Sequence, residues 1–541
     1  MRWRLLSLSA LVCLFAAAPA IAAPPDTIRV GGPSSPDDAK VAVVGTSSSA
    51  VGRTFRVVTR TGRTVLTGRL TAARGTAAPW RHTARADLSA VRTAGSYTVR
   101  VGRLRSRTWL VRPEAQRTPV RTILRYFSTN ADGREPSPAH GPSHLHDAVV
   151  ATGPYAGQHF DLTGGWMDAG DTLKFTQTTA YAAAALQAAA RLDPADAAEL
   201  RATADVGVRW LVKAHPRDDL FIAQVGDERD HQLGFRDPAS DDASPEPGIG
   251  TRQAYPNMGG DLGGKAALAL ALAADRATGA ARDALLDQAR TWYAAGVASG
   301  RPAPDLPKPA GGFYVGDTAD DALAAGAAAL YRSTGEQAYL ESALRFLGRT
   351  HADGSLSWNR LAGFAAADLC GRLGAPAVSD AAAREIACRA LTAQGAAAIG
   401  QARSTAFSTP GPFGWGQTGQ NASGALATAA GTPEGASVGT AARDWLLGLN
   451  PWGASFVAGF GPRSPQRLHH WASLRGRGRP AGGVVGGPAP RADILAQHFG
   501  APKASPFNTP QATYEDNGDD YVTSEPAIDY AAGSILLLAI S

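Results

Sequence analysis

Residues 164–192 read GGWMDAGDTLKFTQTTAYAAAALQAAARL, and this stretch joins the two kinds of sequence that decide the fold. Its first part is a glycine-rich turn that carries Asp168 and Asp171, and its second part, 177–192, consists largely of alanine. Alanine and leucine are strong helix formers, and the apolar residues recur at helical spacing. The stretch therefore predicts a polar loop that leads directly into a helix.

Alanine-rich segments of the same kind recur along the chain after residue 120. Long loops rich in Gly, Pro, Asp and Trp separate them, and such loops are where binding and catalytic residues tend to lie. About twelve helices joined in this way indicate an α/α toroid; a helical solenoid is the alternative, although no fixed repeat period is visible. The further segments are 196–213, 261–275, 280–297, 319–333, 336–349, 380–399, 435–447 and 526–540.

The N-terminal part of the chain has a different texture. Residues 27–112 show the alternation and β-branched content of strands, for example in 40–44 and 54–58. Gly, Ser and Thr turns separate these strands at the short spacing of an all-β sandwich of immunoglobulin size. We expect a linker rich in Arg, Pro and Thr, 113–119, to join this sandwich to a helical domain over 120–541.

Residues 1–22 resemble a secretory signal peptide. Arg2 and Arg4 precede an apolar run, 5–18, and Ala-Ile-Ala at 20–22 supplies the small-residue cleavage pattern. The run is shorter than the ~20 apolar residues that span a bilayer, which favours cleavage over an uncleaved anchor. We therefore expect a secreted, extracellular protein with no membrane partner after cleavage.

Composition and cysteine content exclude several classes of protein. Hydrophobic residues make up 44% and charged residues 18% of the 541 residues, which excludes a disordered chain, a coiled coil or a collagen. The net charge is +6, and no dense Lys/Arg block indicates a nucleic-acid partner. Cys13 lies in the signal segment, so only Cys370 and Cys388 remain, which excludes a C-x-x-C centre. These two could form a disulfide in an exported protein, or stay as two buried free thiols.

The two carboxylates of the glycine-rich turn are the first candidates for chemistry. Only two residues separate Asp168 from Asp171. Two close carboxylates repel each other, which raises the pKa of one of them and prepares the pair for base chemistry. The alternative is structural, namely an Asx turn in which Asp171 caps the following helix.

Two further polar segments lie toward the C-terminus. In 514–530, YEDNGDDYVTSEPAIDY, Glu525 stands just before Pro526 at the expected start of the last helix, where it could simply offset the helix dipole. The aspartates of this segment could hold calcium, but they lack the pattern of an EF-hand. In 449–471, two adjacent histidines end an aromatic, glycine-rich loop that could bind a sugar or a metal. Adjacent residues cannot share the i,i+4 face of a zinc-binding helix, which disfavours the metal.

Taken together, these segments resemble glycoside hydrolase family 9, the inverting β-1,4-glucanase family that includes many secreted cellulases. The resemblance rests on Gly-Gly-Trp-x-Asp-Ala-Gly-Asp at 164–171 and on an aromatic-x-Asp-x4-aromatic-x3-Glu pattern at Tyr514, Asp516, Tyr521 and Glu525. It implies an N-terminal all-β immunoglobulin-like sandwich followed by an all-α (α/α)6 barrel, and it covers nearly the whole mature chain.

The resemblance also implies roles for the three carboxylates. Asp171 would be the general base that takes a proton from the attacking water, and Asp168 would help to hold that water. Glu525 would be the general acid that protonates the leaving oxygen. Inversion requires two carboxyl groups about 6.5–9.5 Å apart, so that a water fits between one of them and the sugar.

The same resemblance places substrate-binding residues in the cleft. His469 and His470 would line it, and Trp415 would be a stacking surface or a cleft wall. The family commonly has Arg after the two histidines and Asn before the acid, whereas this chain has Trp471 and Ser524. These departures leave the substrate open between a cellulose-like glucan, a hemicellulose and a short amino-sugar oligomer.

A structural metal is the last implication of the resemblance. Zinc is often held by cysteines and histidines shortly before the Asp-Ala-Gly-Asp loop, but this chain has no Cys between residues 14 and 369. A three-histidine site of His140, His144 and His146 is the alternative, with zinc disfavoured and structural calcium left open. We expect no required cofactor.

The sequence thus predicts a secreted hydrolase that cleaves β-1,4 bonds of a glucan with inversion and binds a polysaccharide or oligosaccharide as a monomer. A non-catalytic glycan-binding protein on the same scaffold is the main alternative, motivated by the missing Arg and Asn. An unrelated helical-toroid enzyme, such as a polysaccharide lyase, is the third hypothesis.

Overall fold

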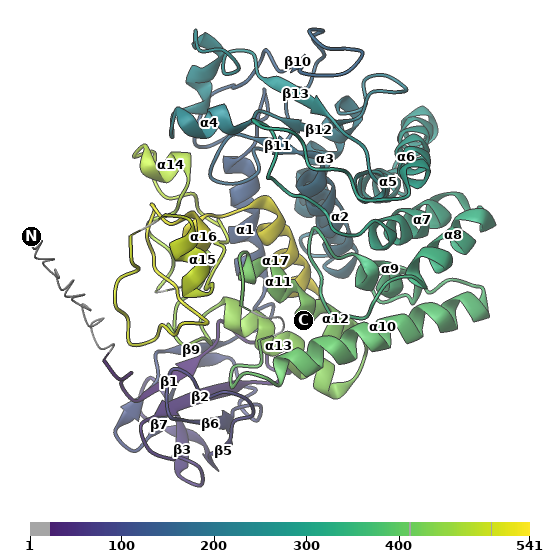
Figure 1. The fold of residues 1–541 in the computed structure, drawn as a ribbon. Coiled ribbons are helices and arrows are strands. Elements are labelled where there is room, and N and C mark those ends of the chain that lie inside the picture. Colours follow the sequence, from purple (N-terminus) through teal and green to yellow (C-terminus); the bar gives the residue numbers. More distant parts are fainter. Residues whose placement is uncertain (1–21, 410–412, 462, 499) are drawn as a thin grey trace, which may run out of the picture.

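The computed structural model describes residues 22–409, 413–461, 463–498 and 500–541, which form a β domain followed by a helical domain (Figure 1). The expected signal segment, 1–22, lies outside the described residues except for Ala22. Among the described helices, none combines the length and the apolarity that crossing a membrane requires.

The N-terminal domain is a sandwich of two antiparallel sheets. One sheet has the strand order β1-β2-β6-β5, and the other has the order β4-β3-β7-β8, with β9 paired to β7. Alternate side chains point inward and form a core that includes Val44, Val57, Val99 and Trp109. The strands are β1 Thr27–Val30, β2 Val41–Thr46, β3 Thr54–Thr59, β4 Thr64–Arg69, β5 Thr71–Ala72, β6 His82–Asp87, β7 Gly95–Val101, β8 Leu104–Arg105 and β9 Trp109–Val111.

The helical domain begins with α1 (Arg117–Thr129), which starts inside the expected linker 113–119. Helices α17, α2, α5, α7, α9 and α12 contact one another in a closed ring, and each packs against an outer partner, in the order α1, α3, α6, α8, α10 and α13. The bounds are α2 Thr176–Leu192, α3 Ala197–Lys213, α5 Gly260–Ala274, α6 Gly279–Ser299, α7 Asp320–Thr334, α8 Gln337–Leu347, α9 Ala362–Leu369, α10 Ala381–Ala402, α12 Gly424–Ala429, α13 Pro433–Leu446 and α17 Ile528–Ile540.

The alanine-rich composition explains this two-layer arrangement. Every residue of α5 is buried, whereas its partner α6 buries only one stripe that includes Leu286 and Trp292. A helix that is apolar all round belongs inside, and one with a single apolar stripe belongs outside. A Cβ at Gly263 would overlap the Trp292 carbonyl, so small residues let α5 and α6 approach closely.

The remaining short elements lie in the loops between these helices. In Figure 1, α4, α14, α15 and α16 lie on the side of the helical domain away from α6 and α8. A small sheet has the order β10-β13-β12-β11. The bounds are β10 Val149–Val150, β11 Lys174–Phe175, β12 Ile222–Val225, β13 Gln253–Pro256, α4 Glu228–Gln232, the 3-10 helices Pro238–Ala243 and Asn421–Ser423, α11 Gln417–Gln420, α14 Trp471–Leu474, α15 Arg491–Ala496 and α16 Tyr521–Ser524.

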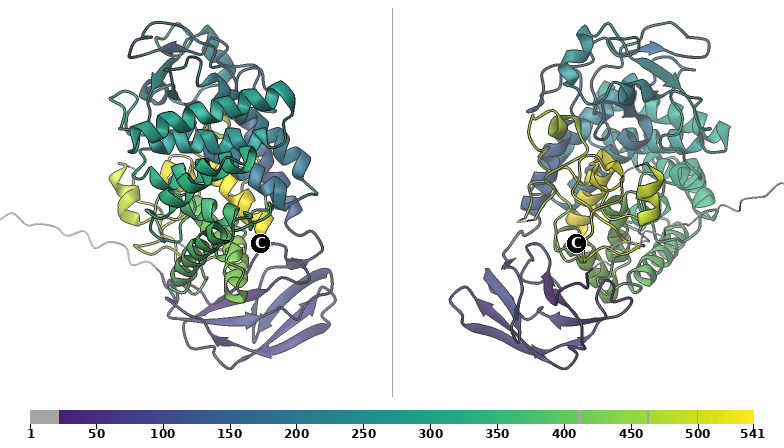
Figure 2. Two further views of the ribbon diagram at one scale, coloured as in Figure 1. Left: turned by 90° about the vertical axis from the view of Figure 1, so that its right-hand side faces the viewer. Right: turned by 60° about the vertical axis from the view of Figure 1, so that its left-hand side comes forward.

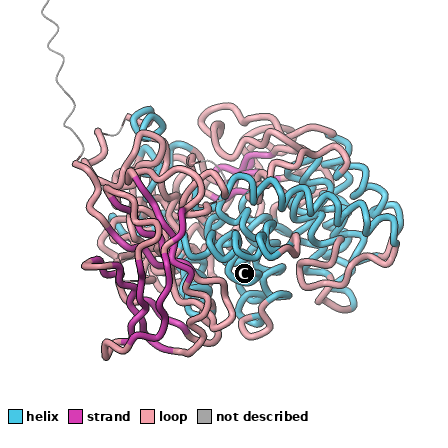
Figure 3. The backbone as a smooth tube through the Cα atoms, turned by 90° about the horizontal axis from the view of Figure 1, so that it is seen from below, coloured by secondary structure: helices cyan, strands magenta, loops and turns pink. Residues whose placement is uncertain are grey.

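The sandwich packs against one end of the helical domain, as Figures 2 and 3 show. Arg443 of α13 is fully buried, and its Nη2 lies 2.9 Å from Asp38 Oδ2 of the β domain. Arg107, next to β9, donates a 3.1 Å hydrogen bond to the Leu447 carbonyl. Buried charges in such a contact tolerate little movement, so the two domains form one packed unit.

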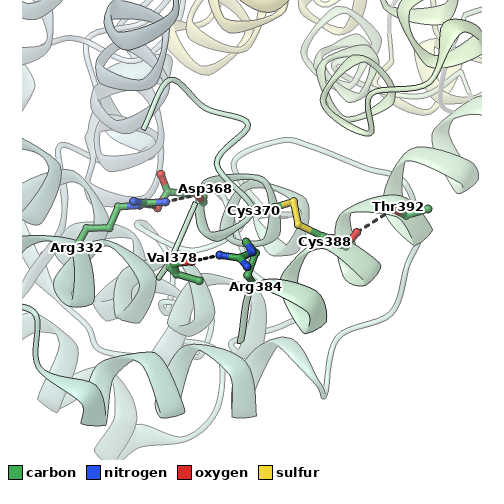
Figure 4. Close-up of a disulfide and its surroundings, with 7 residues drawn as sticks. All are labelled: Arg332, Asp368, Cys370, Val378, Arg384, Cys388 and Thr392. Carbon is green, nitrogen blue, oxygen red and sulfur yellow. Dashed lines mark hydrogen bonds and ion pairs between the residues drawn. A yellow bond between two sulfur atoms is a disulfide. The ribbon is translucent and has the colours of Figure 1, made fainter. Parts of the chain in front are cut away.

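Cys370 and Cys388 form a disulfide that joins the end of α9 to α10 (Figure 4). Their Cα atoms are 5.0 Å apart, within the range of protein disulfides. Of the two alternatives that the sequence leaves open, the structure therefore has the disulfide. Figure 4 also shows Arg332 of α7 paired with Asp368 of α9 beside it.

Candidate active site

The helical domain holds a cavity of about 1120 Å³. Its wall includes residues from the three segments that the sequence marks as chemical. They are the loop before α2 with Asp168 and Asp171, the segment of His469, and the segment between α16 and α17 with Glu525. The fold therefore brings together carboxylates that lie more than 350 positions apart in the chain.

Asp168 is buried in the wall of this cavity. One carboxylate oxygen accepts a short hydrogen bond from Thr178 Oγ1, and the other accepts one of 2.5 Å from Tyr314 Oη. Burial raises the pKa of Asp168 to about 7, although these two donors oppose the shift and the charge of Asp171 adds to it. Its carbonyl accepts 2.9 Å from the Ile528 N–H, which fixes the loop to α17.

Asp171 has a different environment. Its Oδ1 accepts a 3.1 Å hydrogen bond from the Leu173 N–H, which makes an Asx turn. The capping alternative is wrong, because α2 begins at Thr176 with Phe175 at the N-cap and no side-chain cap. The other carboxylate oxygen of Asp171, Oδ2, lies 2.7 Å from Nε2 of His231 in α4. Burial disfavours a charged His231, but the bond and charge of Asp171 outweigh it and raise the pKa of His231 to about 9.

Glu525 meets the aspartate loop through a backbone contact. Its Oε1 accepts a 3.1 Å hydrogen bond from the Gly170 N–H. A Cβ at Gly170 would overlap the His469 carbonyl and lie 3.0 Å from Glu525 Oε1, so only glycine allows this approach. Burial, with the charge of Asp171 adding to it, raises the pKa of the Glu525 carboxyl well above its usual range.

The two adjacent histidines point in different directions. His469 lines the cavity and pairs its Nδ1 with the Gly518 carbonyl at 2.7 Å. His470 is fully buried: its Nε2 lies 2.9 Å from Asn130 Oδ1, and its Nδ1 accepts from the Ala472 N–H. The prediction that both line the cleft is thus wrong for His470. Its backbone is extended (φ −159°, ψ 138°), and neighbouring side chains in extended backbone face opposite sides.

Aromatic side chains form much of the cavity wall. Trp415 lines it and is 46% exposed, with its ring centroid 5.4 Å from that of Tyr521. Trp471, which stands where the resemblance expects Arg, also borders the cavity but is almost fully buried. It packs edge-on against His140, so it belongs to the wall rather than replacing a charged ligand for the sugar.

Two residues of the site escape the sequence analysis. His231 of α4 contacts Asp171 from 60 positions away, and Tyr314 contacts Asp168 from a loop 146 positions away. Tyr314 has a left-handed φ of 44°, which is uncommon for a non-glycine residue and holds its hydroxyl toward Asp168. The segment Gly-Gly-Phe-Tyr at 311–314 repeats the glycine-aromatic texture of the marked loops and is the only signal for it. No sequence signal singles out His231.

The three histidines before the aspartate loop have separate surroundings. Both ring nitrogens of His144 bond to buried carboxylates, whereas His140 packs on an aromatic ring and His146 lies at the surface. The carboxylates of Asp132 and Asp147 already pair with Lys174 and Arg252. Within the described ranges, no three His, Cys, Asp or Glu side chains gather in a way that could hold a metal ion.

Comparison with known proteins identifies the family. Residues 117–538 match the sequence model of "Glycosyl hydrolase family 9", and residues 35–106 match that of the "Cellulase N-terminal ig-like domain". Endoglucanase 15 of Arabidopsis thaliana is 28% identical over 394 residues, which are 64% of this chain and 76% of that protein. Endoglucanase 14 of the same plant is 31% identical over 254 residues, 44% of this chain and 49% of that protein, so the chain spans about half of its length.

Solved structures share the fold over nearly the whole chain. A metagenome-derived glycoside hydrolase family 9 endoglucanase has a TM-score of 0.78 at 24% identity and covers 95% of this chain and 98% of its own. AaCel9A, solved with cellobiose-like isofagomine, has a TM-score of 0.77 at 24% identity and covers 95% and 99%. An N-terminal immunoglobulin-like domain followed by a helical domain is thereby confirmed. Because the family model spans most of the sequence, the chain belongs to glycosyl hydrolase family 9.

Proposed function

We propose that this chain is an inverting glycoside hydrolase of the endoglucanase type that cleaves β-1,4 bonds of a glucan. The observation that carries the proposal is the hydrogen bond from the Gly170 N–H to Glu525 Oε1. It places a lone carboxyl beside the Asp168–Asp171 loop at the wall of one cavity. Family membership and the endoglucanase relatives support the same reaction.

The environments of the three carboxylates support different roles. Glu525 is the general acid, because its raised pKa favours the protonated carboxyl, which can give a proton to the leaving oxygen. Asp171 is the general base: it takes a proton from the water that attacks the anomeric carbon from the opposite face, which inverts that carbon. Asp168, held by Thr178 and Tyr314, helps to hold that water. No cofactor enters this mechanism.

The cavity suits an oligosaccharide chain. Its volume of about 1120 Å³ exceeds the ~300–1,000 Å³ of pockets for drug-sized ligands. Trp415 and Tyr521 offer ring faces to the apolar faces of sugars, and His469 offers a polar edge. We infer that these residues bind a segment of glucan, either cellulose-like or a hemicellulose.

The architecture and location complete the proposal. The ring of inner helices with outer partners supports an (α/α)6 barrel in the described chain. We infer that the protein is secreted through the signal-like segment 1–22 and works outside the cell as a monomer.

The direct test is release of reducing ends from carboxymethyl-cellulose, mixed-linkage glucan, xyloglucan, glucomannan and chitosan. Glu525→Gln keeps the shape of the acid and removes its proton, so we expect kcat to fall by about 10²- to 10⁴-fold. Asp519→Asn is the matched control, because Asp519 is exposed and lies six positions away. Product NMR should show the inverted anomer first.

Other outcomes separate the competing hypotheses. Sugar binding without turnover by the folded wild type would indicate a glycan-binding protein. An unsaturated product that absorbs in the ultraviolet would indicate a lyase. Full activity of Glu525→Gln would refute the role of Glu525.

A further inference from the structure

A network of buried charges lies behind the aspartate loop. Lys174 Nζ lies 2.8 Å from Asp132 Oδ2 and 2.7 Å from Asp147 Oδ2, and Arg252 pairs with the same two carboxylates. His144 bridges Asp132 at 2.7 Å to a further carboxylate at 3.1 Å. The charges balance when His144 is protonated, because four carboxylates then face four cations. The members are Asp132, Asp147, Asp230, Asp241, Lys174, Arg236, Arg252 and His144.

This network holds the residue that follows Asp171. Thr172 Oγ1 donates a 2.7 Å hydrogen bond to Asp230 Oδ1, and its backbone N–H lies 3.4 Å from Asp230 Oδ2. The Thr172 carbonyl accepts a short hydrogen bond from Arg252 Nη1. The hydroxyl and the N–H of Thr172 thus bind a carboxylate of the network, and its carbonyl binds a cation of the same network. Charges that are mutually paired and buried resist displacement, because an unpaired partner would be costly.

The same helix holds Asp171 itself. Asp230 and His231 are neighbours in α4, as Asp171 and Thr172 are in the loop. Asp230 binds Thr172, and His231 Nε2 lies 2.7 Å from Asp171 Oδ2. Asp171 and Thr172 are therefore held by two consecutive residues of one helix. A shift of Thr172 would move the Asp171 carboxylate away from His231.

We propose that the buried network positions the Asp171 carboxylate and that Thr172 is the positioning residue through which it acts. The inference rests on the proposed function, in which Asp171 is the general base. A general base must be aligned with the attacking water, and a misplacement of ~1 Å can lower the rate by about 10²-fold. Asp230 and Arg236 border the cavity, and the other six members of the network hold this alignment from outside the cavity wall.

Three variants test the proposal through kinetics. Thr172→Val keeps the shape of the side chain but removes the hydroxyl that binds Asp230, so we expect kcat to fall ~10- to 100-fold with KM within about twofold. Thr172→Ser, which keeps the hydroxyl, should restore most of the lost rate. Ser143→Ala is the matched control, because Ser143 Oγ donates a 2.7 Å hydrogen bond to Asp132, which reaches the Thr172 carbonyl only through Arg252. It should keep the kcat of the wild type.

A second readout does not depend on turnover. NMR titration measures the pKa of His231, which Asp171, Asp230 and Glu525 raise against the effect of burial. We expect Thr172→Val to lower this pKa by about one unit or more and Ser143→Ala to leave it in place. An unchanged His231 pKa in Thr172→Val, or equal effects of both variants, would overturn the proposal. A wild type that titrates as expected but cleaves no glucan would refute the proposed function and not the positioning.

Discussion

At the scale of single residues, Asp168 shows that a residue of the site lowers the stability of the native protein near neutral pH. Its pKa is about 7 in the native protein because of burial, against an ordinary value of 3.8. As pH rises, the unfolded chain therefore loses this proton before the native protein does. The favourable contribution of Asp168 to the free energy of unfolding is full below pH ~3.8 and is lost by the time pH passes ~7. The difference corresponds to about 4 kcal/mol. We expect Asp168→Asn to be more stable than the wild type at pH 8 and to lose that advantage at pH 4.

Melting temperatures of both proteins at the two pH values check this prediction. An equal difference at pH 4 and pH 8 would show that Asp168 does not titrate in this way. The Asn variant should also lose activity, which is the common exchange of stability for function at a catalytic site.

Residues also show what the sequence can reveal. Asp168, Asp171 and Glu525 are visible because they stand in dense local motifs. His231 reaches Asp171 only because folding places α4 against a loop 60 positions earlier, and no local pattern encodes that contact. His470 looks equivalent to His469 in the sequence, but backbone direction turns one ring to the cavity and the other to Asn130.

At the scale of elements, helical periodicity and alanine content predict most of the helices, whereas their limits depend on tertiary contacts. The Asx turn at Asp171 and the short strand β11 precede α2, which starts at Thr176, one residue before the expected segment 177–192. The pairing of inner with outer helices follows from how many faces of each helix are apolar. Which helices become neighbours in the ring is set by the whole chain and is not readable from any one segment.

The disulfide between α9 and α10 provides a prediction at this scale. It closes a loop of 18 residues, and removing such a crosslink costs about 3 kcal/mol by the chain-entropy estimate. We expect the Cys370→Ser, Cys388→Ser double variant to lose about that much unfolding free energy in urea and to keep its kcat, because neither cysteine lines the cavity. Equal stability of the reduced and oxidised wild type would contradict the estimate.

At the scale of the whole molecule, the buried Arg443 connects the sandwich to the helical domain. It pairs with Asp38 of the sandwich at 2.9 Å and with Asp444 at 3.2 Å.

Arg443→Met leaves both carboxylates without their partner, and removing one member of a buried pair costs roughly 3–5 kcal/mol. Arg403→Met is the matched control, because the Arg403–Glu434 pair is about half exposed and such pairs contribute about 0–1 kcal/mol. In calorimetry we expect Arg443→Met, and not Arg403→Met, to separate unfolding into two transitions, because the two domains then lose their coupling. A single transition at the wild-type temperature in Arg443→Met would show that the remaining contacts, including the Arg107–Leu447 hydrogen bond, hold the domains together without Arg443.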